Sequence, residues 1–186
     1  DEPLETASLN TFRIAPEKFF HWFRPLANQI FHAQPNPAHT ALAEFEQAGY
    51  QNTIITQNID GLHQKAGSKQ VVEMHGTLRT LSCTQCYKKF PSEEFLKPFI
   101  ENGTLPYCIN CNGLLKPDVI LFGEQLPQAA WQTAQRATRQ CDLMLVAGSS
   151  LEVLPVAGLP IQALDHGAHL IIINNTTTYV NVRADI

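Results

Sequence analysis

The sequence predicts an α/β fold in which a doubly wound parallel sheet carries an inserted cysteine-rich module and a helical module. Four short runs are continuously apolar: NTIIT (52–56), DVILF (118–122), DLMLVAG (142–148) and HLIIIN (169–174). Parallel strands that are covered on both faces show this pattern, whereas strands with one face in water alternate. Helix-forming segments separate the last three runs, and this order of strands and helices is typical of a doubly wound sheet.

The first 50 residues are predicted to form the helical module. Pro16 suits the first turn of a helix, and Phe19, Phe20 and Phe23 then fall on one apolar face. After the proline-rich link AQPNP, a second helix is predicted from Pro37 to Ala48. Its inward side chains are predicted to be Leu42 and Phe45, and its C-cap Gly49.

The rest of the chain divides into two parts. PQAAWQTAQRATRQ (127–140) and SLEVLPVAGLPIQALDHG (150–167) are predicted helices that link the later strands. Residues 78–117 interrupt the alternation and are expected to be rich in loops. The predicted division is therefore a helical module at 1–50, a Rossmann-like domain at 51–77 and 118–186, and a cysteine-rich module at 78–117.

Composition limits the classes of function. The 186 residues are 44% hydrophobic and 16% charged, which is typical of a globular protein. The net charge of −4 argues against nucleic-acid binding, since nucleic-acid binders are usually basic. No apolar run approaches the roughly 20 residues that span a bilayer, so no membrane association is expected.

Four of the five cysteines form two pairs, Cys83-x2-Cys86 and Cys108-x2-Cys111. Two such pairs offer four soft thiolate ligands to one tetrahedral zinc ion, and a closed site of this kind is structural. A redox pair and packed free thiols are the alternatives. Cys141 stands alone before a predicted strand and is expected to be a packed thiol. An odd, clustered set of cysteines indicates a reducing, intracellular environment, and we expect a cytoplasmic protein.

Polar residues follow several of the predicted strands, where open α/β sheets hold their ligands. TQNIDGLHQKAG (56–67) places an amide and an acid directly after the first strand, Gly148-Ser149-Ser150 follows another, and Asn174-Asn175 ends the last. Backbone N–H groups of a Gly-Ser-Ser turn can hold a phosphate or ribose, and paired amides can bind ribose hydroxyls. Common loop and turn roles are the alternatives, and no G-x-G-x-x-G fingerprint occurs. His75 could be a general base, although a structural histidine is as consistent with its spacing.

These motifs, taken in order, resemble the sirtuins, a family of NAD-dependent protein lysine deacetylases. The matching pieces are TQNIDGLHQKAG, EMHGTL, the two cysteine pairs, LLKPDVILFGEQLP, GSSLEVLPVAGLP and IIINN, and the resemblance runs from about residue 15 to residue 175. The resemblance implies two cofactors, NAD and Zn²⁺, and an acetylated lysine-containing protein or peptide as substrate. It implies an enzyme of the transferase type.

The resemblance assigns roles residue by residue. His75 matches the catalytic histidine of the family, and Asn58 is expected to take part with it. Gln57 is expected to contact the nicotinamide ribose. The residues expected to shape the nicotinamide pocket are Asn58, Ile59 and Asp60. Those expected on the adenosine and ribose side are Gly148, Ser149, Ser150 and Asn174. Those expected to pair with the acetyl-lysine peptide as an added strand are Val119, Phe122, Gly123 and Glu124. The zinc ligands are Cys83, Cys86, Cys108 and Cys111.

In the mechanism implied by the family, the acetyl oxygen attacks C1′ of the nicotinamide ribose and nicotinamide leaves. His75 then takes a proton from a ribose hydroxyl, and the products are free lysine, nicotinamide and O-acetyl-ADP-ribose. An apolar lysine tunnel would favour this attack over hydrolysis of NAD. ADP-ribosyl transfer to proteins or removal of another acyl group from the same site, a zinc-ribbon binding module and an inactive scaffold remain as alternatives.

The sequence departs from the family pattern at its ends. Sirtuins begin with a Gly-Ala-Gly-x-Ser turn and a G-x-P-x-F-R cofactor loop, and neither is found between Asp1 and Ile186. We therefore expect the middle of a sirtuin that binds NAD poorly by itself, because the glycine turn would hold the pyrophosphate. None of the four tyrosines begins the Tyr-x-x-Arg pair of sirtuins that remove acidic acyl groups, so plain deacetylation is expected.

Overall fold

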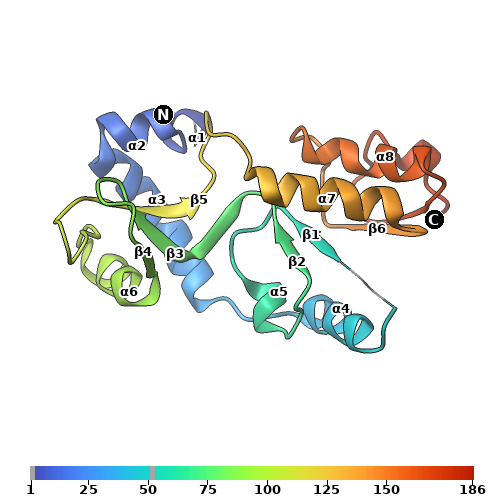
Figure 1. The fold of residues 1–186 in the computed structure, drawn as a ribbon, viewed down its shortest axis with the longest axis horizontal. Helices are drawn as coiled ribbons and strands as arrows, with labels where there is room; N and C mark the ends of the chain where they lie inside the picture. The colour runs from blue at the N-terminus through green and yellow to red at the C-terminus, as the bar shows by residue number, and fades with distance from the viewer. Residues whose placement is uncertain (1–2, 51–52) are drawn as a thin grey trace. The chain divides into compact units, whose positions relative to one another are not determined.

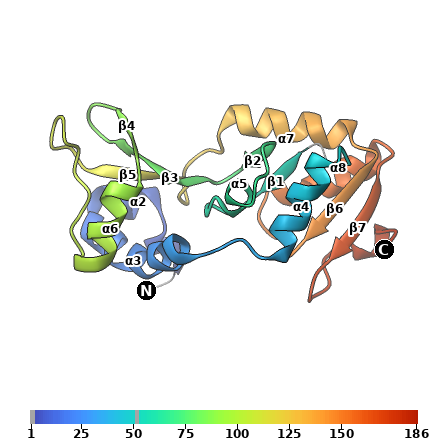
Figure 2. The ribbon, with the colours of Figure 1, turned by 90° about the horizontal axis from the view of Figure 1, so that it is seen from below.

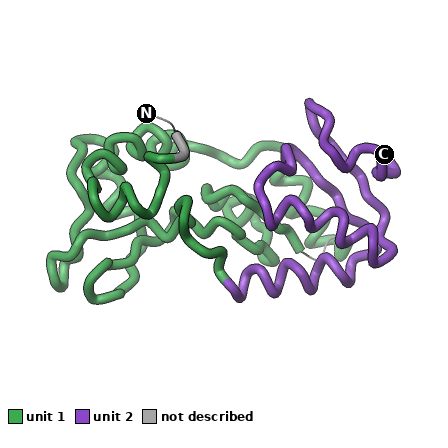
Figure 3. The backbone as a smooth tube through the Cα atoms, turned by 90° about the horizontal axis from the view of Figure 1, so that it is seen from above, with its two compact units in different colours: residues 1–127 green, residues 128–186 purple. Residues whose placement is uncertain are grey.

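The computed structural model describes residues 3–50 and 53–186, without the side chains of Pro3 and Leu4. The chain forms two compact units, residues 1–127 (unit 1) and residues 128–186 (unit 2), which Figure 3 colours separately. Among the described helices, none combines the length and the apolar character needed to cross a bilayer. The predicted three-part division is finer than these two units and remains a prediction.

The helices near the N-terminus of unit 1, together with one later helix, build an aromatic core. The helices are α1 (Pro3–Thr6), α2 (Leu9–Ile14), α3 (Pro16–His32) and α6 (Glu93–Asn102), and α6 lies beside α3 (Figures 1 and 2). As predicted, α3 begins at Pro16 and buries Phe19, Phe20 and Phe23 on one face. Phe12 of α2 and Phe99 of α6 complete this core with edge-to-face and stacked ring contacts. Large aromatic side chains bury more apolar surface than any others, so these rings supply most of the stability of the module.

Arg24 joins α3 to the end of α6. Its guanidinium donates from Nε and Nη2 to the carbonyl oxygen of Ile100 at 2.9 and 2.8 Å, and from Nη2 to that of Glu101 at 2.9 Å. The last carbonyl groups of a helix have no partner within the helix, and a cation there also complements the helix dipole. Gly103 ends α6 in the left-handed conformation with φ +76°. Residues 93–102 therefore belong to the helical core, although they lie inside the predicted cysteine-rich module.

The region that is predicted to be rich in loops also contains a three-stranded antiparallel sheet and α6, with loops at 84–88 and 103–114. The strands are β3 (Gly76–Cys83), β4 (Lys89–Pro91) and β5 (Leu115–Val119), in the order β4-β3-β5. The prediction of a parallel strand at 118–122 is wrong, because the strand begins at Leu115 and pairs antiparallel with β3. Lys116 and Pro117 obscured it, since lysine and proline are both uncommon in strands.

A two-stranded parallel sheet in unit 1 carries the first predicted strand. The strands are β1 (Ile54–Thr56) and β2 (Val71–Glu73), and the short helix α5 (Leu62–Lys65) lies between them in the chain. The predicted strand started at Asn52, which lies outside the described residues. The preceding helix α4 (Pro37–Gln47) buries Ala43, but Phe45 is 51% exposed, so the prediction of an inward Phe45 is wrong. Gly49 has φ +80° and follows the C-cap residue Ala48.

Unit 2 has a second parallel pair of strands with helices beside them. Its elements are α7 (Gln128–Gln140), β6 (Leu143–Ala147), the 3₁₀ helix η1 (Val156–Gly158), α8 (Leu159–Asp165), β7 (His169–Ile173) and the 3₁₀ helix η2 (Asn181–Arg183). Both predicted strands and the first predicted helix are confirmed, but residues 151–155 are not helical. The prediction that β6 is covered on both faces is wrong within the described part of the chain, because Leu143 and Leu145 are 48% and 41% exposed.

Candidate functional site

The loop after β1 carries the amide and the acid that follow a buried strand. Its backbone is held by local hydrogen bonds: the N–H of Asn58 donates to Thr56 Oγ1 at 3.0 Å, and the N–H of Leu62 donates to Asp60 Oδ1 at 2.9 Å. The N–H of Leu78, from β3, donates to the carbonyl oxygen of Ile59 at 2.9 Å. These bonds use Thr56, one oxygen of Asp60 and the backbone of Ile59, while the side chain of Asn58 is exposed. The loop is therefore held by contacts within the chain itself.

His75 lies between β2 and β3 and contacts the same loop. Its Nδ1 atom is 3.2 Å from the carbonyl oxygen of Gln57. A carbonyl oxygen can only accept a hydrogen bond, so in the neutral ring Nδ1 carries the proton and Nε2 keeps a lone pair. Burial lowers the pKa of His75, and the hydrogen bond to Gln57 offsets this in part by favouring the charged form. The ring is thus a neutral base with a defined tautomer at neutral pH.

Gly76 allows β3 to pass close to β5 directly after His75. Its φ is +76°, and a Cβ at this position would overlap the carbonyl oxygen of Asp118 and lie 3.1 Å from Val119 Cα. Only glycine fits, because it has no Cβ and reaches positive φ without strain. The N–H of Ile120 donates to the carbonyl oxygen of His75 at 2.8 Å, which fixes this carbonyl group.

The residues predicted to bind the acetyl-lysine peptide lie on the segment that leaves β5. Val119 is buried in the aromatic core and Phe122 is 52% exposed. Gly123 is exposed with φ +89°, and nothing lies within 4 Å of the position of a Cβ. Glu124 is half-buried, and its Oε2 accepts a hydrogen bond from the N–H of Leu121 at 2.8 Å. The structure thus places Phe122 and Gly123 at the surface and turns Val119 and Glu124 inward.

The residues predicted for the adenosine and ribose side lie together at the ends of β6 and β7 in unit 2. The side-chain amide of Asn174 accepts from the N–H of Ser149 at 3.0 Å and donates to its carbonyl oxygen at 2.6 Å. The N–H of Gly148 donates to the carbonyl oxygen of Ile173 at 3.0 Å. Ser150 is exposed, and the next residue, Leu151, has φ +55°. Both ends of the Asn174 amide are therefore used to shape this turn.

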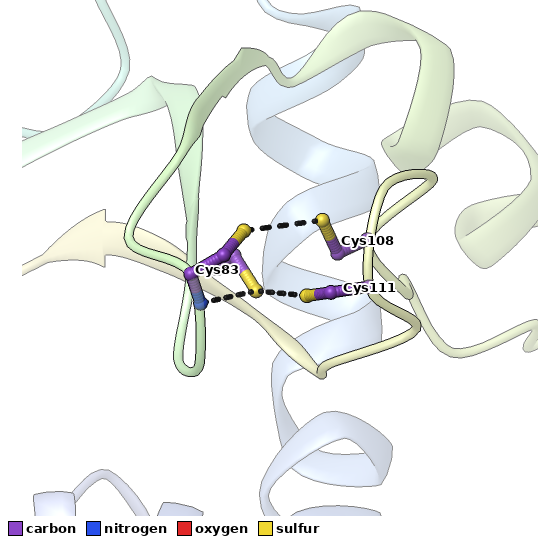
Figure 4. A group of neighbouring side chains, drawn as sticks. Cys83, Cys108 and Cys111 are labelled. Carbon is purple, nitrogen blue, oxygen red and sulfur yellow. Dashed lines mark hydrogen bonds between the residues drawn. The ribbon is translucent and has the colours of Figure 1, made fainter.

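The four paired cysteines meet, as the spacing predicts. Their sulfur atoms all lie within 4.8 Å of one another, with Cys83 Sγ 3.4 Å from Cys111 Sγ and Cys86 Sγ 3.7 Å from Cys108 Sγ. Figure 4 shows Cys108 and Cys111 pointing from one loop toward Cys83 on the other. Four thiols in this arrangement fit the tetrahedral coordination of zinc. All four positions are taken by protein ligands, so a zinc ion here would stabilise the fold and not activate a substrate.

The two cysteine loops have the same backbone form. The residue after each second cysteine is left-handed, Tyr87 and Asn112 both having φ +59°. Their N–H groups donate to the carbonyl oxygens of Cys83 and Cys108, at 3.1 and 2.8 Å. Burial raises the pKa of the Cys83 thiol, but hydrogen bonds from the backbone N–H groups of Cys86 and Gln85 and from the Cys111 thiol lower it to about 6 overall. The loop therefore stabilises the thiolate that a metal requires.

Comparison with known proteins assigns this arrangement to a family. The model of the Sir2 family matches residues 1–155. A protein of Thermodesulfovibrio yellowstonii named NAD-dependent protein deacetylase is 45% identical over 166 residues, which are 89% of this chain and 65% of that protein. The chain belongs to the Sir2 family. Archaeoglobus fulgidus has a relative named NAD-dependent protein deacylase 2, which is 41% identical over 100% of this chain and 73% of its own length. The chain thus spans about two thirds to three quarters of the length of these Sir2 relatives.

Solved Sir2 structures have the same fold. A structure titled as Sir2Tm bound to a propionylated peptide has a TM-score of 0.90 at 38% identity, over 97% of this chain and 76% of its own. A Sir2 homolog in complex with NAD also has a TM-score of 0.90, at 39% identity over 99% of this chain and 70% of its own. These similarities confirm the predicted membership of the sirtuins, which form the Sir2 family, and the NAD-dependent deacetylase class of the family. Together with the cysteine cluster, they also confirm the α/β fold with its cysteine-rich module.

Two residues that the sequence reading missed support the predicted site. Arg79 lies over the turn at Gly61, where a Cβ would be 2.9 Å from Arg79 Cδ, and its Nη2 donates to Glu73 Oε2 at 2.7 Å. Nothing in the spacing of Arg79 marks this contact. Lys116 is 16% exposed on β5 and forms an ion pair with Glu124. A lysine inside a buried strand is a signal that could have found it, because lysine is rarely buried unless it is paired.

Proposed function

We propose that the protein removes acetyl groups from lysine side chains, with the ADP-ribose part of NAD as the acceptor of the acetyl group. The single observation that carries this proposal is the contact of His75 with the loop after β1. His75 Nδ1 is held by the carbonyl of Gln57, so Nε2 remains as a base beside the residues that match the nicotinamide pocket of the family. A base with a defined tautomer, fixed by a backbone partner, is what a proton-transfer step needs.

The loop at Gln57–Asp60 is proposed to hold the nicotinamide end of NAD. The carboxamide of nicotinamide has one acceptor and two donor hydrogens, and the amide of Asn58 and the free oxygen of Asp60 can complement both. Ile59 and Gln57 then line the pocket and contact the ribose. In unit 2, the Gly148-Ser149-Ser150 turn is proposed to contact the adenosine side through its backbone. The Asn174 amide is proposed to orient that turn, since it already binds both backbone groups of Ser149.

In the proposed reaction, the acetyl oxygen of the substrate would bond to C1′ of the nicotinamide ribose as the bond from C1′ to nicotinamide breaks, so that NAD supplies ADP-ribose and releases nicotinamide. His75 accepts a proton at Nε2 from a ribose hydroxyl, so that this oxygen can attack the carbon of the acetyl group. The proton on Nδ1 stays on the ring, hydrogen-bonded to the Gln57 carbonyl, and this bond keeps the ring oriented. The carbon–nitrogen bond to lysine then breaks, lysine leaves as the amine, and one water adds to the acyl carbon so that O-acetyl-ADP-ribose is released. Proton transfer by a positioned side chain of this kind contributes about 10²- to 10⁴-fold to a rate.

The substrate is proposed to be an acetylated peptide segment that adds as a strand at Gly123-Glu124, because the N–H and C=O of the preceding Phe122 are already bonded to Ala7 and Leu9. Strand addition gives affinity through main-chain hydrogen bonds. Gly123 offers an unobstructed backbone, because it is exposed and no atom lies within 4 Å of the position of its missing Cβ. Solved Sir2 structures include complexes with an acetylated peptide and with a p53 peptide, which supports this class of ligand. No nucleic acid or membrane partner is part of the proposal.

The cysteine cluster is proposed to hold one zinc ion with a structural role. Zinc would join the Cys83–Cys86 loop to the Cys108–Cys111 loop and so fix the sheet β4-β3-β5. Thiol ligands must stay reduced to bind zinc, so the proposal includes a reducing compartment such as the cytoplasm.

The deciding experiment measures nicotinamide release by the full-length protein with NAD, in the presence and absence of an acetyl-lysine peptide. Release that requires both the peptide and His75 supports the proposal, and O-acetyl-ADP-ribose must form in equal amount. Label transferred from NAD to protein without an acetylated peptide would instead indicate ADP-ribosyl transfer. Because one relative is named a deacylase, matched acetyl, propionyl and succinyl peptides are compared, and we expect acetyl to react faster than succinyl.

A further inference from the structure

Lys116 and Glu124 form an ion pair across the segment that leaves β5. The ammonium of Lys116 lies 2.9 Å from Glu124 Oε2, and the two side chains are only 16% and 21% exposed. The nearby pair of Lys89 and Asp118 is more open, since the Lys89 side chain is 64% exposed. Taking two charges out of water is unfavourable unless each gains further partners.

Both charged groups gain those partners from the backbone of the intervening segment. Lys116 Nζ donates to the carbonyl oxygen of Val119 at 2.8 Å, and Glu124 Oε2 accepts from the N–H of Leu121 at 2.8 Å. The side chains of Val119 and Leu121 are buried in the aromatic core at 4% and 6% exposure. Lys116 thus fixes the carbonyl group of Val119, and Glu124 fixes the N–H of Leu121. The aromatic core fixes the side chains of Val119 and Leu121.

The other edge of this segment is also occupied. The N–H of Ile120 donates to the carbonyl oxygen of His75 at 2.8 Å. Phe122 donates its N–H to the carbonyl oxygen of Ala7 at 3.1 Å and accepts from the N–H of Leu9 at 2.9 Å. Alternate residues of an extended segment turn their backbone groups to opposite edges, so both edges are held from Val119 to Phe122. Gly123 is the next residue, exposed and with φ +89°.

We propose that the Lys116–Glu124 pair is a positioning device for the strand of the acetylated peptide. This inference rests on the proposed function, in which the peptide adds at Gly123-Glu124, directly after the ordered residues 119–122. An edge that is already ordered does not lose conformational entropy when the peptide binds, and this raises affinity. Lys116 is then a positioning residue, and Glu124 acts through the backbone of Leu121 as well as by its place in the segment.

The test measures the dissociation constant of a fluorescent acetyl-lysine peptide for the full-length protein and for Lys116→Met and Glu124→Gln. We expect about a tenfold weaker affinity for Lys116→Met, which is about 1.4 kcal/mol. The peptide KM should rise to a similar extent, while kcat at saturating peptide changes less than about twofold, as for loss of uniform binding. Lys89→Met is the matched control and should leave the peptide affinity unchanged. Zinc content and melting temperature are measured for every variant to check that it folds. If Lys116→Met does not fold, Glu124→Gln still tests the ion pair, because glutamine has nearly the same shape as glutamate.

The reversed pair Lys116→Glu/Glu124→Lys separates the backbone contacts from the charge pair. Opposite charges are restored, but a lysine at 124 cannot accept from the Leu121 N–H, and a glutamate at 116 cannot donate to the Val119 carbonyl. We expect no recovery of affinity, and full recovery would overturn the role of the backbone contacts. Unchanged peptide affinity in both single variants would overturn the inference alone. A wild-type protein that binds no acetylated peptide would overturn the proposed function itself.

Discussion

The Nδ1 atom of His75 lies 3.2 Å from the backbone carbonyl oxygen of Gln57, which joins the candidate base to the candidate nicotinamide loop. Burial lowers the pKa of His75 below its usual value of 6.5. The neutral base therefore persists below pH 6.5, and its protonation removes activity only as the pH falls through the lowered pKa. We predict that the acid limb of kcat for deacetylation is centred below pH 6.5, as measured by nicotinamide release at saturating peptide and NAD.

Two further measurements test the assignment of this limb to His75. His75→Asn should lower kcat by about 10²-fold or more, the range of a lost general base, while the melting temperature changes little. The stability of the protein should also depend on this group. Because the folded pKa is lowered, the stabilising contribution is complete above pH 6.5 and is lost as the pH falls from 6.5 through the folded pKa. An acid limb centred above pH 6.5 would contradict the burial argument.

Gly76→Ala is predicted to destabilise unit 1 strongly. The new Cβ would meet the carbonyl oxygen of Asp118 while the residue keeps φ +76°. A left-handed non-glycine residue costs about 1–2 kcal/mol and the overlap with backbone adds about 1–3 kcal/mol. Gly49→Ala is the matched control, because Gly49 has φ +80° but no atom within 4 Å of the Cβ position. Urea unfolding should show about 2–5 kcal/mol lost for Gly76→Ala and about 1–2 kcal/mol for Gly49→Ala, and equal losses would argue against a close approach.

The sequence predicts best those elements whose pattern depends on neighbours in the chain. The helix from Pro16 has its signal in a proline at the first turn and three phenylalanines on one face, and the cysteine pairs specify their ligand geometry through spacing alone. The strands β6 and β7 were found because each is a continuous apolar run. These features need no knowledge of distant contacts.

The errors arise where tertiary contacts override the local pattern. β5 contains Lys116 and Pro117, so its apolar signal is displaced toward residues 120–122, which are not in the strand. α6 joins the aromatic core through Phe99, a contact with α3 that no sequence period shows. At the candidate site, the motifs locate His75 and the loop after β1, but the bond between them depends on how β2 and β3 meet. The pairing of Lys116 with Glu124 likewise depends on the path of the intervening segment.

Removal of zinc is predicted to unfold the sheet β4-β3-β5. The four sulfur atoms lie within 4.8 Å of one another, and without a cation only weak contacts between thiols join the two loops. Zinc binding supplies about 10 kcal/mol or more of folding free energy in small zinc-dependent modules. Treatment with a chelator should therefore lower the melting temperature and the near-ultraviolet circular dichroism. Metal analysis should find one zinc per chain in the wild-type protein and much less in Cys111→Ser.

Gly113→Ala gives a zinc test that leaves all four ligands in place. A Cβ at Gly113 would lie 2.9 Å from Cys83 Sγ and 2.9 Å from Gln85 Cγ, so the sulfur must shift. Zinc affinity should fall by about 10- to 100-fold, the usual effect of disturbing the groups around a metal ligand. Competition with a chromophoric chelator measures this change. Gly158→Ala is the control, since nothing lies within 4 Å of that Cβ position, and a Gly113→Ala protein with wild-type zinc affinity would show that the loops yield easily.

Asn174→Ala is predicted to disorganise the Gly148-Ser149-Ser150 turn and to weaken NAD binding. The Asn174 amide accepts from the Ser149 N–H at 3.0 Å and donates to the Ser149 carbonyl at 2.6 Å, and both bonds would be lost. Two hydrogen bonds are worth about 1–3 kcal/mol together, so chemical unfolding should show a loss of that size. NAD affinity, measured by calorimetry on the full-length protein, should fall by about tenfold or more, because 1.4 kcal/mol is a factor of ten.

Two variants separate the turn from direct contact with NAD. Asn174→Asp can still accept from the Ser149 N–H, but its carboxylate would face the Ser149 carbonyl without a proton to donate, so it should recover only part of the stability. Asn175→Ala changes an exposed amide beside it and should leave both stability and NAD affinity near wild type. If Asn174→Ala weakens NAD binding but leaves the unfolding free energy unchanged, the amide acts on the nucleotide directly. If both fall together, Asn174 acts by holding the backbone of Ser149.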